Sequence, residues 1–175
     1  MNKTRKITKI AVLSAIAFIL QTFGDLIKVG GFLEVEFSDF PAIIGACAMG
    51  PLSGLAVEGI KCLLHFLTMN STGGIGDLAN FLVNGSFVLT CGIIYKYNRT
   101  KKGALISLLS ATAVMTLFAV LANLFITIPV YMPALDFSGR LNIVLTLITP
   151  FNFAKGLVLS LITYFSYKKL SSLLK

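Results

Sequence analysis

Residues 104–131 read ALISLLSATAVMTLFAVLANLFITIPVY, and this stretch decides the class of fold. It contains no charged side chain, and a helix needs only about 20 mostly apolar residues to cross a bilayer. Across the 175 residues, 56% are hydrophobic and 13% are charged, whereas soluble domains carry about 25% charged residues. The composition therefore argues against a soluble domain and a disordered chain, and it predicts an all-α integral membrane protein.

Further apolar segments lie on both sides of this stretch, separated by polar turns and by Gly or Pro. We predict six transmembrane helices, which leave no room for a soluble catalytic domain, so residues 1–175 form one transmembrane domain. The expected helices are Ile7–Ile27, Pro41–Met49, Pro51–Leu67, Gly76–Tyr95, Ala104–Tyr131 and a last one from Pro150 to Lys169. The second is short, and we expect it to be tilted or broken.

Two connections are expected to have structure of their own. Residues 28–38 contain an alternating Val-Glu-Phe pattern, which predicts a structured loop with an extended stretch. Leu141–Ile148 is apolar and is interpreted as a half-buried or interfacial piece before Pro150 begins the last helix. The N-terminus resembles a signal peptide, but its apolar run continues past Ala15-Ile16-Ala17, so an uncleaved first helix is expected.

The basic residues predict the orientation of these helices. With both termini in the cytoplasm, 11 of the 15 basic residues fall in cytoplasmic segments and none of the seven acidic residues does. Positive charge on the cytoplasmic side is the usual pattern of multi-pass proteins in the cell membrane. The net charge of +8 is therefore interpreted as a topology signal, and nucleic acid is not an expected partner.

Catalysis and metal binding have little support in the sequence. Cys47, Cys62 and Cys91 lie in apolar runs without a metal-ligand spacing, so we interpret them as small buried hydrophobic residues. No Gly-Lys dipeptide occurs, which excludes a Walker A phosphate loop, and no G-x-S-x-G motif accompanies the single histidine. No catalytic residue, metal ligand or cofactor is therefore predicted.

Polar side chains within the predicted spans are candidate site residues, because such groups are costly in a bilayer and usually face a site. Asn152 and Lys155 are three residues apart and share a helix face, and Asn123 lies within the preceding helix. Lys155 is placed about one turn inside the outer end of its helix. It either extends to the interface or points into a pocket, and Asn123 either bonds a neighbouring helix or meets a ligand.

Two further polar groups lie on the third and fourth predicted helices. Glu58 and Lys61 are three residues apart, and we predict a structural ion pair between them. His65 is interpreted as a structural residue rather than a metal ligand. Asp77 is interpreted as a helix-start residue. Farther along the fourth helix, Asn80 and Asn84 are candidates for the same cavity as Asn123.

Small residues at four-residue spacing indicate close helix contacts. Ala11 and Ala15 share one face of the first helix, and Ala42, Ala46, Gly50 and Gly54 repeat the step farther on. Such faces usually pack internally, and one that faces lipid would suit a partner subunit. Spacing alone does not distinguish these alternatives.

Seven short motifs are spread over nearly the whole chain: residues 37–41 (FSDFP), 50–54 (GPLSG), 61–65 (KCLLH), 73–81 (GGIGDLANF), 102–104 (KGA), 122–123 (AN) and 150–156 (PFNFAKG). Together they resemble the riboflavin-specific S components of energy-coupling factor (ECF) transporters. The Asn123 segment and the Asn152-x-x-Lys155 spacing are the parts most suggestive of riboflavin. The six-helix layout and the Ala11–Ala15 spacing are common to S components.

The resemblance implies a fold, a function and partners. An S component captures a vitamin outside the cell and delivers it inward with a membrane T component and two cytoplasmic ATPases, so this chain would not itself be an enzyme. The residues that match the family's ring-binding positions are Asn123, Asn152 and Lys155. A first-loop acid also contributes: Glu36 is the match, with Glu34 as the alternative. The residues matching the T-component contact are Ala11 and Ala15.

Riboflavin would be the transported ligand, not a cofactor. Its flat ring system would be buried by first-loop side chains such as Phe32, Leu33 and Phe37, because apolar burial contributes about 25 cal/mol per Å². Three alternatives remain open: an S component for another vitamin or a flavin nucleotide, a self-sufficient secondary transporter, and a small membrane scaffold.

Overall fold

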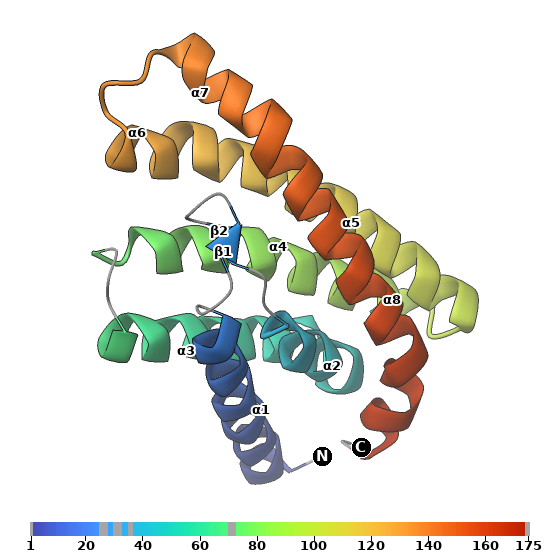
Figure 1. Cartoon of the computed structure of the whole chain (residues 1–175). Helices are drawn as coiled ribbons and strands as arrows, with labels where there is room; N and C mark the ends of the chain where they lie inside the picture. Colours follow the sequence, from blue (N-terminus) through green and yellow to red (C-terminus); the bar gives the residue numbers. More distant parts are fainter. Residues whose placement is uncertain (1, 25–27, 30–32, 35–36, 70–72, 174–175) are drawn as a thin grey trace.

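The computed structural model describes residues 2–24, 28–29, 33–34, 37–69 and 73–173, with side chains described for 2–24, 37–69 and 73–166. These residues form a helical bundle with one two-stranded ribbon (Figure 1). The helices are α1 (Lys3–Gly24), α2 (Asp39–Met49), α3 (Pro51–Met69), α4 (Ile75–Tyr97), α5 (Lys101–Ala122), α6 (Ile128–Tyr131), α7 (Phe137–Ile143) and α8 (Thr149–Leu173). The antiparallel strands are β1 (Lys28–Val29) and β2 (Leu33–Glu34), which confirm an extended stretch in the first loop.

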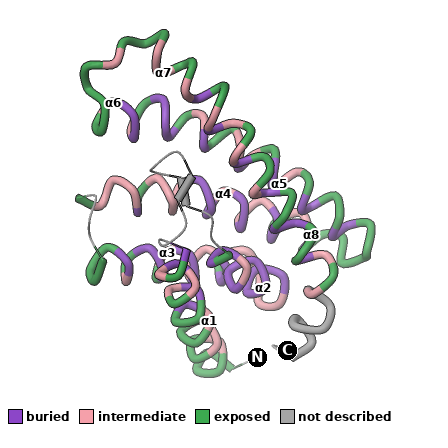
Figure 2. The backbone as a smooth tube through the Cα atoms, viewed as in Figure 1, coloured by how far each residue is buried: buried purple, intermediate pink, exposed green. Residues whose placement is uncertain are grey.

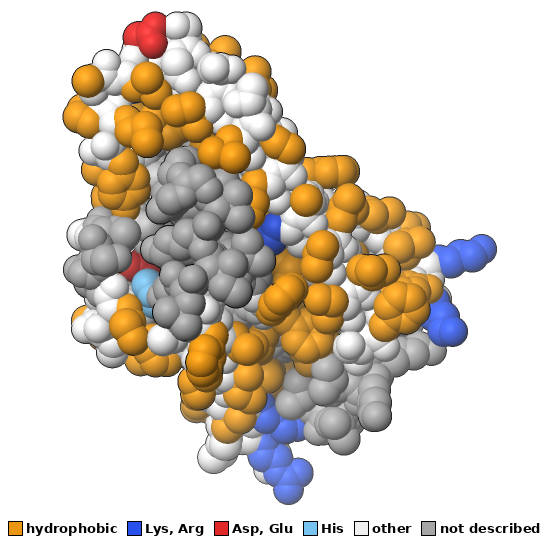
Figure 3. All heavy atoms as spheres, in the orientation of Figure 1, with side chains coloured by type: hydrophobic (Ala, Val, Ile, Leu, Met, Phe, Trp, Pro, Cys, Tyr) orange, Lys and Arg blue, Asp and Glu red, His pale blue; other side chains and the backbone are white. Residues whose placement is uncertain are grey.

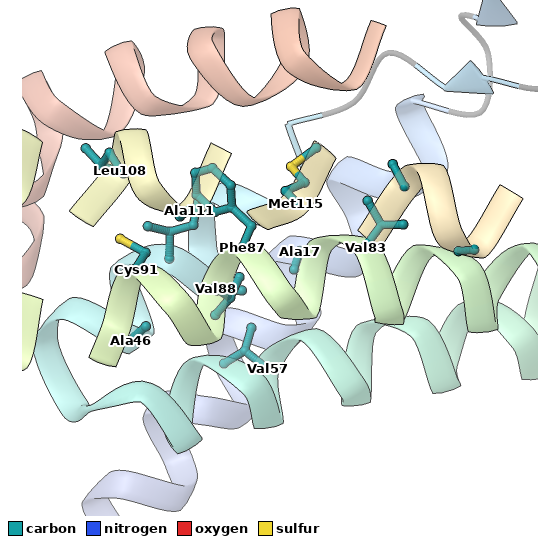
Figure 4. Close-up of a cluster of buried hydrophobic side chains, with 14 of the residues drawn as sticks. Ala17, Ala46, Val57, Val83, Phe87, Val88, Cys91, Leu108, Ala111 and Met115 are labelled. Carbon is teal, nitrogen blue, oxygen red and sulfur yellow. The ribbon is translucent and has the colours of Figure 1, made fainter. Parts of the chain in front are cut away.

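The core lies where α4 packs between α3 and α5. Phe87, Val88 and Cys91 of α4 lie among side chains of the neighbouring helices, including Val57 of α3 and Met115 of α5 (Figure 4). All five are buried. All three cysteines are buried and free of disulfides, which confirms their prediction as small hydrophobic residues. α8 packs against α5 and α2, and α1 packs against α2 and α3, which closes the bundle.

Apolar side chains also cover the outside of the bundle. Leu52 and Phe165 are 72% and 75% exposed, and hydrophobic side chains gather at several places on the visible face, over α7, along α8 and over α1 (Figure 3). Figure 2 shows the exposed residues of α1 and α5 on the sides that face away from the other helices. A soluble protein rarely exposes so much contiguous apolar surface, and this surface matches a hydrocarbon environment.

Within the described part of the chain, five helical segments are long and apolar enough to cross a membrane: Lys3–Gly24, Pro51–Met69, Ile75–Tyr97, Lys101–Tyr131 and Phe137–Ser166. They correspond to five of the six predicted spans. The remaining one, α2, has 11 residues, about half of what a straight crossing requires. It was expected to be short, and it ends at Gly50, whose φ of 100° is a left-handed value that suits glycine. α3 begins at the next residue.

The prediction for the last helix was wrong. Leu141–Ile148 is not a separate interfacial piece, and Pro150 does not begin the helix, because α7, a π-helical turn η2 (Val144–Ile148) and α8 follow one another without a break from Phe137 to Leu173. The helix begins instead at Phe137 and is capped by Asp136, whose carboxylate accepts a 3.0 Å hydrogen bond from the backbone N–H of Gly139. An aspartate with an extended backbone and this side-chain hydrogen bond is an ordinary N-cap.

π-Helical turns explain why two prolines occur inside long helices. A proline lacks a backbone N–H and its ring clashes with the carbonyl four residues earlier. The turns η1 (Asn123–Thr127) and η2 precede Pro129 and Pro150. Within them the N–H groups of Ile128 and Thr149 already bond carbonyls five residues back, on Asn123 and Val144. The backbone hydrogen-bonding pattern of the helix has thus already shifted by one residue at the position before each proline.

Ala42, Ala46 and Gly54 pack internally between α2 and α3, which decides between the two alternatives that their spacing left open. A Cβ at Gly54 would lie 2.5 Å from Ala46 Cβ and 2.6 Å from the Ala42 carbonyl oxygen. The backbone oxygen belongs to α2 and cannot move away without moving that helix. The two helices therefore approach each other as closely as they do because position 54 has no side chain.

We expect Gly54→Ala to lower the stability of the folded chain by about 1–3 kcal/mol through overpacking. Gly59→Ala is the matched control on the same helix, because its Cβ would meet only Phe81 at 3.4 Å. Both changes raise helix propensity equally, so a lower unfolding temperature in detergent for Gly54→Ala alone isolates the clash. Equal unfolding temperatures would show that α2 and α3 are not in close contact.

Candidate functional site

A buried cluster of charged side chains lies among α2, α3, α4 and α8. Lys61 is fully buried, and its Nζ lies 2.6 Å from Glu58 Oε1 and 2.8 Å from Asp39 Oδ1. The same ammonium group donates a 3.0 Å hydrogen bond to Ser38 Oγ. The predicted Glu58–Lys61 ion pair is confirmed, and Asp39 joins it from the first residue of α2.

Asp39 also contacts a second lysine, which is half-buried. Its Oδ2 lies 3.1 Å from Lys155 Nζ, with side-chain exposures of 1% for Asp39 and 12% for Lys155. Because the last helix begins near Phe137, Lys155 lies about five turns into it rather than one turn inside its outer end, which corrects the predicted depth. Extension to the interface is the wrong interpretation of Lys155, since its ammonium is held within the bundle.

Two asparagines of α4 continue the cluster. Lys155 Nζ donates a 3.4 Å hydrogen bond to Asn84 Oδ1, and the Asn84 amide donates to Asn80 Oδ1. Asn84 is almost fully buried, at 1% exposure. Three of the predicted site residues, Lys155, Asn84 and Asn80, are therefore connected through direct contacts between two helices.

Asn123 and Asn152 flank the two π-helical turns. Asn123 is the first residue of η1, and Asn152 lies in the first turn of α8 just after η2. Both are buried, and each amide nitrogen donates a 2.9 Å hydrogen bond to the carbonyl four residues earlier, on Ala119 and Ile148 respectively. Each amide still has a second N–H and a carbonyl oxygen with which to meet a ligand. π-Helical turns occur frequently at functional sites.

His65 and Asp77 form a separate pair where α3 ends and α4 begins. His65 Nδ1 lies 2.6 Å from Asp77 Oδ1, and both side chains are largely buried. The prediction of a structural role for His65 is confirmed in the sense that it has a fixed partner. Asp77 also lies in the first turn of α4, as expected.

A groove of about 450 Å³ lies beside this pair, lined by Phe66, Gly74, Leu78 and Phe81 among others. None of the residues predicted to bind substrate lines it. The groove opens on the apolar outside of α3 and α4, so it is a feature of the lipid-facing surface and not part of the buried charged cluster.

The predicted first-loop contacts are only partly placed. Phe32 and Glu36 lie outside the described residues, and for Leu33 and Glu34 only the backbone of β2 is described. Phe37 is 46% exposed where the chain enters α2. The choice between Glu34 and Glu36 as a ligand contact therefore stays a prediction.

The predicted partner surface lies on the outside of α1. Ala11 and Ala15 are both exposed, whereas Ser14 and Ala17 of the same helix are buried. This face is therefore not used for packing within the described part of the chain. It stays a predicted contact for another subunit.

Asp39 is the site residue that the sequence analysis missed. It lies within the FSDFP motif, but an acid at the start of an apolar helix is ordinarily interpreted as a helix-dipole residue. Its two lysine partners are 22 and 116 positions away in the sequence. The available signal was charge balance: two lysines within the spans required more than one carboxylate, and only Glu58 had been assigned.

Comparisons with known proteins agree with this architecture. Residues 5–167 match the family model of the ECF transporter, substrate-specific component. The riboflavin transporter FmnP of Bacillus subtilis (strain 168) is 35% identical over 176 residues, with 96% of this chain and 93% of the relative covered. The riboflavin transporter RibU of Staphylococcus aureus (strain TCH60) is 34% identical over 180 residues, covering 100% and 95%.

A solved structure, described as that of the S component of a bacterial ECF transporter, superposes on this fold with a TM-score of 0.85. It is 33% identical, and the match covers 99% of both chains. The apolar helices and these transporter relatives make the chain a multi-pass protein of the cell membrane. Because the family model and the solved structure both match nearly the whole length, the chain belongs to the substrate-specific S components of ECF transporters.

Proposed function

We propose that this chain is the riboflavin-binding S component of an ECF importer. It captures riboflavin outside the cell and delivers it inward together with a T component and two ATPases. The observation that carries the proposal is the similarity, along the whole chain, to relatives named riboflavin transporters. The buried amides and the lysine described above provide donors and acceptors of the kind that such a ligand needs.

The proposed orientation places both termini in the cytoplasm. Basic side chains gather where α1 begins and where α4 turns into α5, and an acidic side chain lies at the opposite end, over the α6–α7 connection (Figure 3). Positive residues favour the cytoplasmic side. In this orientation α2 serves as the sixth, short membrane element, and the β1–β2 ribbon lies outside.

The proposed recognition uses an apolar ring and a polar edge. Riboflavin presents a flat ring system whose polar edge has both donors and acceptors. Asn123, Asn152 and Lys155 would bond this edge, because an asparagine amide donates and accepts and an ammonium only donates. Asn84 and Asn80 extend the polar surface from Lys155 along α4. An analogue that leaves these buried groups unpaired would bind more weakly.

Removing one of these groups should weaken riboflavin binding without unfolding the chain. We expect Asn123→Ala, Asn152→Ala and Lys155→Ala each to cost about 1–3 kcal/mol by leaving a buried partner unpaired, which is about 5–150-fold in Kd. Quenching of flavin fluorescence by the purified variants measures the affinity.

Asn142→Ala is the matched control for this series. Asn142 is exposed on the same continuous helix as Asn152, so its removal should leave the Kd near that of the wild type. Folded Asn123, Asn152 and Lys155 variants that all keep wild-type affinity would rule out the proposed ring-binding residues.

A further inference from the structure

Asp39 contacts two lysines that belong to different helices. Lys61 is on α3 and Lys155 is on α8, and one carboxylate oxygen of Asp39 faces each of them, at 2.8 Å and 3.1 Å. Neither Asp39 nor Lys61 is more than 1% exposed. The carboxylate is therefore held in place by Lys61, which is itself paired with Glu58 at 2.6 Å.

This arrangement restricts where the ammonium group of Lys155 can lie. A lysine side chain is flexible and a large part of its rotamer freedom must be lost when it is fixed at one point. Left alone near apolar surface, it would extend toward water. In this structure Asp39 Oδ2 and Asn84 Oδ1 hold the ammonium from two sides, at 3.1 Å and 3.4 Å.

Among the described residues, the charges of the cluster also balance. Glu58 and Asp39 supply two negative charges, and Lys61 and Lys155 supply two positive ones. Glu58 with Lys61 would already form a neutral pair without α2. Among the described residues, Asp39 is thus the carboxylate paired with Lys155, and it occupies that position from the residue at which the first loop enters α2.

We propose that Asp39 is a positioning residue for substrate: it neutralises Lys155 and aims its ammonium group at the ligand. Asp39 does not itself touch the ligand. Lys61 and Glu58 hold Asp39 in turn, so the cluster is a support for one functional lysine. This inference rests on the proposed riboflavin-binding function, because it assigns Asp39 to the same site.

A double-mutant cycle on riboflavin affinity tests this role. In the otherwise wild-type chain, we expect Asp39→Asn to raise the Kd about tenfold, because interacting residues couple strongly. In the Lys155→Met background the same change should alter the Kd less than about twofold, because the lysine it acts through is gone. A purely structural role for Asp39 would raise the Kd by the same factor in both backgrounds.

Asp39→Glu provides a second test in case the Asp39→Asn variant does not fold. It keeps the negative charge beside Lys61 and moves the carboxylate by one methylene, so the variant should fold and bind riboflavin with full stoichiometry. Its effect on the Kd should also be smaller in the Lys155→Met background than in the otherwise wild-type chain. Asp77→Asn is the matched control, since Asp77 is a largely buried acid paired with His65 instead. We expect it to leave the Kd within about twofold of the wild type, because its carboxylate is paired with His65 and not with Lys155.

The outcomes separate this inference from the proposed function. If the wild-type chain binds riboflavin and the effects of Asp39 and Lys155 multiply independently, Asp39 is not a positioning residue, and the proposed function stands. If the wild-type chain binds no riboflavin, the proposed function fails and the inference fails with it. Coupling seen with both Asp39 variants, and not with Asp77→Asn, is the expected result.

Discussion

Replacing Ala11 and Ala15 together by tryptophan should abolish ATP-driven riboflavin uptake while leaving riboflavin affinity near the wild-type value. Both alanines are exposed on α1, and only such small side chains let another helix approach closely. Two indole rings on this face would keep a T component at a distance. The candidate binding residues lie on α4, η1 and α8, so the change should not reach them.

Two measurements are needed for each variant: ligand titration of the isolated chain, and uptake by the assembled transporter. Ala113→Trp is the matched control, because Ala113 is an exposed alanine on α5, and we expect it to keep uptake. Normal uptake by the doubly substituted chain would show that this face of α1 is not a subunit contact. Loss of binding together with uptake would show that the substitution disturbs the fold instead.

Lys61→Met should be among the most destabilising single substitutions in the chain. It removes the ammonium group that Glu58 and Asp39 share, and breaking a buried ion pair by removing one partner costs about 3–5 kcal/mol. Glu58→Gln should also destabilise the chain, because it leaves the cluster with one positive charge too many. The double substitution Glu58→Gln with Lys61→Met leaves Asp39 paired with Lys155. It should be more stable than either single variant.

Unfolding in detergent, followed by circular dichroism, compares these variants on one scale. Lys102→Met is the control, since Lys102 is exposed in the first turn of α5 and its charge has little effect on stability. If the double variant is less stable than Lys61→Met alone, then charge balance does not govern the stability of the cluster.

Local spacing predicted the parts of this site that lie on one helix. The three-residue step between Glu58 and Lys61 indicated an ion pair, and the structure contains it. The last helix was mispredicted because Pro150 is an ordinary first-turn residue in sequence terms. Whether a proline begins a helix or is accommodated within it depends on the preceding backbone, and the π-helical turn Val144–Ile148 has no signature in composition.

The spacing of residues along the sequence did not predict the contacts between different helices. Asp39 binds lysines on α3 and α8, and nothing in its own neighbourhood indicates either partner. The depth of Lys155 was likewise misjudged because it was measured from Pro150 instead of Asp136, where the helix is capped. The exposure of Ala11 and Ala15 required the packing of α1 to be known, since small-residue faces occur both inside bundles and between subunits.

We propose that this chain binds riboflavin by itself, before any partner joins it. The most direct measurement is the absorption spectrum of the chain purified alone from riboflavin-containing medium, followed by titration of the ligand-stripped protein with riboflavin. We predict that flavin bands co-purify at near-stoichiometric level and that titration saturates at the same ratio. If the purified, folded chain shows neither flavin bands nor saturable riboflavin binding, it is not a riboflavin-binding subunit.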